Sequence, residues 1–114
     1  LSHAFYAAYD PVTPGSLSTR IANDLLRDEL GFTGVAITDD LGTGAIRATT
    51  GVAPAGVAAI GAGADMLLVE SPADAAAVRE ALLAALDSGT LEPQRLDQAV
   101  GRVLALKRSL GLVE

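Results

Sequence analysis

The most constraining stretch of this sequence is a short apolar, β-branched run that ends abruptly in two acids. Residues 31–44 read GFTGVAITDDLGTG, so residues 35–38 are followed directly by Asp39 and Asp40 and then by two glycines. A short apolar run bounded by turn residues is typical of a buried strand. Acids that end such a strand lie at one rim of a sheet, where parallel α/β folds collect their chemistry.

Helical patterns alternate with two strand-like runs along the chain. We expect helices within residues 18–30, 54–60, 71–87 and 93–110, strands at about 35–38 and 64–69, and a loop over 41–50. The helix start at Ser71-Pro72 is the strongest, because serine caps, proline suits the first helical position and Asp74 lies in the first turn. Alternating strands and helices predict an α/β fold with parallel strands.

The number of strands is small for such a fold. Two strands, or three if Leu1–His3 forms another, are too few for a stable doubly wound sheet or a closed barrel. The sequence also begins at Leu1 without an initiator methionine. We therefore expect a piece of a larger fold, or a domain that assembles through its open strand edges.

Charge and composition exclude several classes of function. The 14 acids and 8 bases give a net charge of −6, which argues against nucleic acid and anionic membranes as partners. There is no cysteine, and therefore no disulfide framework or thiolate metal site. We expect no metal, no cofactor, no signal peptide and no membrane span, and the compartment stays open between cytoplasm and cell envelope.

Asp39 and Asp40 are the leading candidates for chemistry, and side-chain alternation along a strand points them to opposite sides. At most one of them therefore faces a site on the strand axis. Such an acid is a carboxylate nucleophile, an Mg²⁺ ligand or phosphoacceptor, or only a cap of the following turn. For His3 a surface or packing role competes with function. We expect Asp65 to hydrogen-bond backbone, and the charges of the last two helices to form a solvated face.

Residues 31–41 also resemble the nucleophile segment of family 3 glycoside hydrolases, in particular their β-N-acetylhexosaminidase branch. Four other stretches resemble the same family in the same order: Ser2-His3 with residues 10–18, residues 25–32, residues 62–68, and residues 95–112. No single motif is decisive, but together they extend the resemblance over essentially residues 1–114.

The resemblance implies that residues 1–114 are the last third of a (β/α)8 TIM-type barrel, the family's catalytic domain. Asp39 aligns with the nucleophile, which forms a glycosyl-enzyme that water resolves with retention of configuration. His3 aligns with a residue at the rim of the sugar pocket, and Thr43 stands where the family often carries a methionine against the sugar. The substrate implied is a carbohydrate that contains N-acetylglucosamine.

The same resemblance places other essential groups outside these residues. The branch takes its acid/base from an upstream His-Asp pair and binds sugar through an upstream Arg and Lys-His. Without general acid and positioning we expect the chain alone to be inactive. Three functions stay open: part of a retaining β-N-acetylglucosaminidase, a non-catalytic barrel piece that assembles through its strand edges, and an Asp phosphoacceptor or Mg²⁺ domain.

Overall fold

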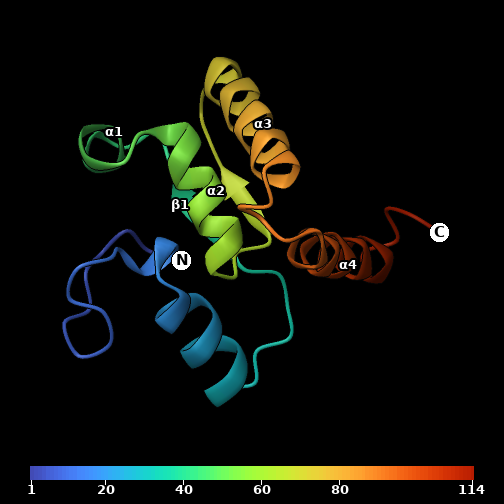
Figure 1. Cartoon of the computed structure of the whole chain (residues 1–114). Helices are drawn as coiled ribbons and strands as arrows, with labels where there is room; N and C mark the ends of the chain where they lie inside the picture. Colours follow the sequence, from blue (N-terminus) through green and yellow to red (C-terminus); the bar gives the residue numbers. More distant parts are fainter.

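The computed structural model describes all 114 residues as a two-stranded parallel sheet with helices packed on one of its faces (Figure 1). In chain order the elements are the 3₁₀ turn η1 (Gly15–Leu17), the π-helix η2 (Arg20–Glu29), β1 (Ile37–Asp40), α1 (Gly44–Thr49), α2 (Val52–Ala62), β2 (Met66–Leu68), α3 (Pro72–Asp87) and α4 (Pro93–Ser109). The predicted mixture of helices and parallel strands is confirmed. The predicted partial barrel is not, because two strands do not define one.

The two strands pair in parallel, with Ile37 opposite Met66 and Asp40 opposite Leu68. The other edge of β1 is also occupied, although Leu1–His3, which the sequence left open as a third strand, does not form one. The Leu1 amino group donates to the Ile37 carbonyl (2.6 Å), and the Asp39 N–H donates to the Leu1 carbonyl (2.8 Å). These two bonds have the pattern of a parallel ladder, so Leu1 holds the position of a third strand.

The helices follow their sequence signals closely where caps and prolines are present. The Ser71 hydroxyl accepts from the N–H groups of Ala73 and Asp74, with Pro72 at the first position of α3. The expected loop over 41–50 is wrong in part, because α1 forms inside it. The helix expected before Gly31 is a 3₁₀ turn followed by a π-helix, and Gly31 ends it at φ +66°.

The core is small and aliphatic, and it lies between the sheet and the helices. One cluster joins the end of β1 to α1, α2 and α3, and a second joins α2 and α3 to the residues before α4: Leu41, Ile46, Val52, Ala55 and Val78 in the first, and Ile60, Ala85 and Leu91 in the second. Only 22 of the 114 residues are buried, so much of the apolar content stays near the surface.

The opposite face of the sheet has no cover. Ile37, Met66 and Leu68 point to this face and are 40–44% exposed, whereas Thr38 on the helix side is 3% exposed. In Figure 1 the helix α2 lies against one side of the strands. We call this the uncovered face. Separately, none of the helices is long and apolar enough to cross a membrane.

Candidate active site

The two acids that end β1 point to opposite sides, as expected. Asp39 is exposed on the uncovered face, in line with Ile37, whereas Asp40 turns toward the helices. One Asp39 oxygen accepts the N–H of Asp40 (2.9 Å), and the other has no partner in the protein. Beside it lies an open depression of about 310 Å³, lined by Leu1, Ser2, Ile37, Thr38 and Asp39. Asp39 is thus an accessible, anchored carboxylate.

A bulge in β1 lies immediately beside Asp39. Between its two paired positions β1 advances by three residues, from Ile37 to Asp40, whereas β2 advances by only two, from Met66 to Leu68. β1 therefore contains one extra residue. The Thr38 hydroxyl accepts the Leu68 N–H (3.1 Å) where the ladder is interrupted. Such bulges bend a strand and redirect side chains, and they are common next to active sites. Nothing in the sequence pattern had indicated this bulge.

The Asp40 carboxylate has a local partner instead of an open site. One of its oxygens accepts the N–H of Gly42 (2.9 Å), and a Cβ at Gly42 would lie 3.2 Å from both carboxylate oxygens. Asp40 therefore caps the turn after β1, the structural alternative considered from the sequence. Because Asp39 points to the other side, the two acids do not converge on one cation or phosphoryl group.

His3 lies behind the end of β1, with both of its ring nitrogens in contact with protein. Its Nε2 is 2.8 Å from the carbonyl oxygen of Asp40, and its Nδ1 is 2.6 Å from the hydroxyl of buried Ser16. The ring is partly buried. Its direct contact with a sugar stays a prediction, and neither nitrogen is free for it.

Thr43 lies three residues beyond β1 and begins α1. Its backbone N–H donates to the Asp40 carbonyl (3.3 Å), while its hydroxyl is shielded from solvent and has no partner in the protein. Its predicted place beside a sugar also stays a prediction. No group of three or more His, Asp or Glu that could hold a metal occurs in the chain.

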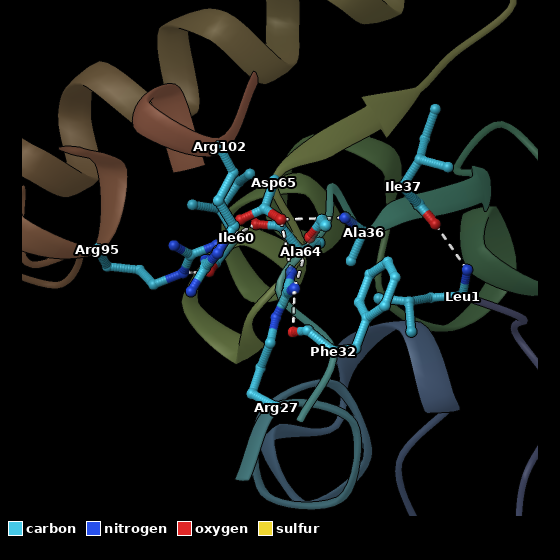
Figure 2. A network of polar contacts seen from close by, with 11 residues as sticks. Leu1, Arg27, Phe32, Ala36, Ile37, Ile60, Ala64, Asp65, Arg95 and Arg102 are labelled. Atoms are coloured by element: carbon cyan, nitrogen blue, oxygen red, sulfur yellow. Dashed lines mark hydrogen bonds and ion pairs between the residues drawn. The ribbon is translucent and has the colours of Figure 1, made fainter. Parts of the chain in front are cut away.

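The start of β1 is held by an ionic cluster around Asp65, which lies just before β2 (Figure 2). The Asp65 carboxylate is inaccessible to solvent and contacts the guanidinium groups of Arg27 (2.5 Å), Arg95 (2.9 Å) and Arg102 (3.0 Å). It also accepts the N–H of Ala36 (3.0 Å), the backbone contact expected from the sequence. The cluster ties η2 and α4 to the point where the chain enters β1.

The three arginines were not predicted as a group. Arg95 and Arg102 were assigned to a solvated helix face, which is wrong because both turn inward to Asp65. Arg27 further donates to the carbonyls of Phe32 (2.9 Å) and Gly34 (2.6 Å), so it fixes the loop before β1. The only sequence signal was an acid preceding an apolar run, in a chain with few bases.

Electrostatics favour the charged form of Asp65. Burial by itself would raise the pKa of this carboxyl, but the Ala36 N–H and the arginines outweigh burial and lower the pKa below its usual value. The pKa of Asp10 is also lowered, chiefly by the Ser18 hydroxyl, which donates to it at 2.7 Å. Both acids are therefore structural anions around the segments that carry His3 and Asp39.

Comparison with known proteins identifies the family. Residues 1–106 match the family model described as the glycosyl hydrolase family 3 N terminal domain. The chain is 38% identical over 101 residues, 89% of its length, to a β-N-acetylglucosaminidase/β-glucosidase of Cellulomonas fimi, and this match covers 18% of that protein. It is 39% identical over 72 residues, 63% of its length, to a β-hexosaminidase of Stenotrophomonas maltophilia, where it covers 21%.

A solved structure agrees with this assignment. A family 3 β-N-acetylglucosaminidase from Paenibacillus sp. FPU-7 superposes with a TM-score of 0.89 at 41% identity, over 93% of this chain and 20% of that one. The chain thus spans about a fifth of the length of each of these three relatives. By its family model and its relatives, the chain belongs to glycosyl hydrolase family 3.

Proposed function

We propose that this chain supplies the nucleophile of a retaining β-N-acetylglucosaminidase or closely related β-glycosidase, and that Asp39 is that nucleophile. One observation carries the proposal: at the carboxyl end of β1 and on the uncovered face, Asp39 has one oxygen held by the Asp40 N–H and one oxygen free. The sugar follows from the relatives, whose names refer to N-acetylglucosaminidase and β-glucosidase activities.

The proposed reaction uses the free oxygen of Asp39. This oxygen attacks the anomeric carbon while the glycosidic bond breaks, and the leaving alcohol takes a proton from an acid outside these residues. Water then attacks the same carbon and gives a proton back to the acid outside these residues, the bond to Asp39 breaks, and the carboxylate is restored with the sugar configuration retained. Asp40 takes no part in this sequence, because it faces the helices.

We further propose that the uncovered face is the interior of a (β/α)8 barrel that the preceding βα units complete. Leu1 already occupies the next ladder position beside β1, and the far edge of β2 is free. An apolar groove of about 350 Å³ lies beside each sheet edge, lined on one side by Leu1, Tyr6, Tyr9, Ile21 and Leu25, and on the other by Leu67, Val69, Leu82, Leu83 and Leu86. These grooves suit neighbouring units of the same barrel.

A chimera tests the proposal, with this chain replacing the matched region of the Paenibacillus enzyme. We expect the chimera to hydrolyse a nitrophenyl N-acetylglucosaminide, and Asp39→Asn to lower kcat by at least about 10⁴-fold, because covalent attack is lost. A fluorinated glycosyl donor that slows hydrolysis of the intermediate should add one sugar to the peptide that carries Asp39, as measured by mass spectrometry.

The neighbouring acid provides the matched control. Asp40→Asn keeps an oxygen for the Gly42 N–H and should retain the sugar adduct, with kcat within about tenfold of the parent. A folded chimera that is inactive, or one labelled at Asp40, would contradict the proposal. Inversion of the product, seen by NMR as the opposite anomer at early times, would equally contradict a covalent role for Asp39.

A second candidate function rests on the same uncovered face. The exposure of Ile37, Met66 and Leu68 also favours a non-catalytic piece that associates with copies of itself. The two functions separate in the chimera experiment, because a self-associating module would neither restore hydrolysis nor acquire a sugar at Asp39.

A further inference from the structure

We propose that His3 is a positioning residue, which holds the carbonyl of Asp40 and thereby fixes the orientation of the Asp39 carboxylate. The inference rests on the proposed role of Asp39 as nucleophile. In this role His3 contacts the backbone next to the nucleophile, instead of the sugar contact that the resemblance implies.

The contact with the Asp40 carbonyl fixes a hydrogen on the Nε2 of His3. A carbonyl oxygen only accepts, so the Nε2 that lies 2.8 Å from the Asp40 oxygen carries a hydrogen. In the neutral ring Nδ1 then accepts from the Ser16 hydroxyl at 2.6 Å, and in the protonated ring Nδ1 donates to it. The bond to Asp40 is kept in both protonation states, which suits a holding role.

The other end of this link is firmly anchored. Ser16 is fully buried, and its N–H donates to the carbonyl of Ser2 (2.9 Å). Two residues on, the buried Ser18 hydroxyl donates to Asp10, whose carboxylate also accepts the N–H groups of Val12 and Thr13. His3 is thus held by a structured loop, and a rigid anchor is what a positioning contact requires.

The Asp40 carbonyl, which His3 contacts, lies between two other fixed points of the backbone. Just before it, the Asp39 N–H is fixed by the Leu1 carbonyl, and just after it, the Leu41 N–H is fixed by the Leu68 carbonyl (3.0 Å). The bulge of β1 lies between Ile37 and Asp40, and the Asp40 N–H holds the Asp39 carboxylate. The bond from His3, together with the longer one from the Thr43 N–H (3.3 Å), therefore restrains Asp40, the residue whose N–H holds the nucleophile.

Two amide substitutions in the chimera separate the two bonds of His3. The longer side chain of His3→Gln places an N–H donor where Nε2 lies, so this variant keeps the contact with Asp40. The shorter side chain of His3→Asn places its amide where Nδ1 lies, so this variant keeps only the contact with Ser16. We expect His3→Asn to lower kcat about 10- to 100-fold, the cost of a misplaced reacting group, with KM within about threefold. His3→Gln should restore most of kcat.

A pH profile completes the test. Because His3 transfers no proton in this role, His3→Gln should leave the shape of the kcat/KM profile unchanged. Equal losses in the two variants, a loss carried mainly by KM, or disappearance of one limb of the profile in His3→Gln would overturn the inference. A structural role alone is also distinguished, since it would lower the Tm of both variants without separating their kcat values.

Failure of the inference and failure of the proposed function give different results. In ¹⁵N-histidine NMR of the chimera, the His3 signals are those that vanish in His3→Gln, and they should show a slowly exchanging proton on Nε2. A folded chimera with this signal but without activity or sugar adduct contradicts the nucleophile proposal alone. An active chimera without a protected Nε2 proton contradicts the role of His3.

Discussion

At the scale of single residues, β1 is fixed at both ends by side chains from other parts of the chain. At its start, Arg27 and Asp65 hold the loop and the Ala36 N–H, and at its end His3 holds the Asp40 carbonyl. The single negative charge of Asp65 offsets only part of the charge of its three arginines. Its removal would nevertheless leave all three guanidinium groups partly or fully buried without a charged partner. Asp65 is accordingly the residue on which the local structure most depends.

We predict that Asp65→Asn lowers the free energy of unfolding of the chimera by about 3–5 kcal/mol, the usual cost of removing one partner of a buried ion pair. Urea denaturation at pH 7 measures this change. Glu80→Gln is the control, since Glu80 pairs with Arg79 on the surface with both side chains at least 70% exposed, and its loss should cost no more than about 1 kcal/mol. Similar costs for the two variants would refute a structural role for the cluster.

The stability contributed by Asp65 should also depend on pH. Its folded pKa is lowered below the unfolded value, so the charged form stabilises the fold fully above the unfolded pKa, and this contribution is lost as pH falls through the folded pKa. The difference in unfolding free energy between parent and Asp65→Asn should therefore stay constant from pH 7 to 5 and shrink below about pH 4. A difference that grows on acidification would reverse the assigned sign.

Sequence reasoning at this scale identified individual residues better than their partners. Asp39, Asp40 and Asp65 stood out because each borders an apolar run, and strand alternation correctly separated the first two. The contacts of Asp65 with its three arginines, in contrast, join residues 30 to 38 positions apart in the chain. No local pattern specifies such pairs, so they became evident only in the folded structure.

At the scale of elements, α2 connects the two parallel strands and packs closely on α3. The contact is possible because Gly56 has no side chain, and a Cβ built there would lie 2.6 Å from the Val78 Cγ1 and 3.3 Å from Leu67 Cδ1. Gly61 in the same helix has no atom within 4 Å of an added Cβ. The two glycines therefore separate the cost of a clash from the intrinsic helix propensity.

We predict that Gly56→Ala destabilises the chimera by about 1–3 kcal/mol through overpacking against Val78. Gly61→Ala should stabilise it by about 0.5–1 kcal/mol, because alanine loses less backbone entropy in a helix. Thermal unfolding of both variants provides the comparison. Stabilisation by Gly56→Ala would show that α2 and α3 are farther apart than described.

Helices were predicted well where capping chemistry is local, as at Ser71 and Pro93, because a few consecutive residues determine such starts. The π-helical form of η2, the short α1 and the bulge in β1 were missed. Each depends on packing or on register against a distant segment. For the site, this means that the position of Asp39 in the sequence was predictable, but the backbone geometry that presents it was not.

At the scale of the whole molecule, the chain exposes more surface than a self-sufficient domain of its size. Its accessible area is 6492 Å², whereas a folded monomer of 11.5 kDa is expected to expose roughly 5800 Å². Part of this surface is the uncovered face, with Ile37, Met66 and Leu68 beside the free edge of β2. Exposed apolar strands with an open edge favour association with another chain or segment.

We therefore predict that the isolated chain forms oligomers or aggregates, with a molar mass by light scattering above 11.5 kDa that rises with concentration. Leu68→Lys should shift this chain toward monomer, because a charge on the uncovered face opposes strand-to-strand association. Val12→Lys is the control, since Val12 is 80% exposed in the N-terminal loop away from that face, and it should leave the mass unchanged.

In the chimera Leu68→Lys should instead abolish hydrolysis, because the lysine would be buried inside the barrel without a partner. A monomer that unfolds cooperatively at high concentration, or an active Leu68→Lys chimera, would show that the uncovered face is an ordinary solvent surface and not the interior of a barrel.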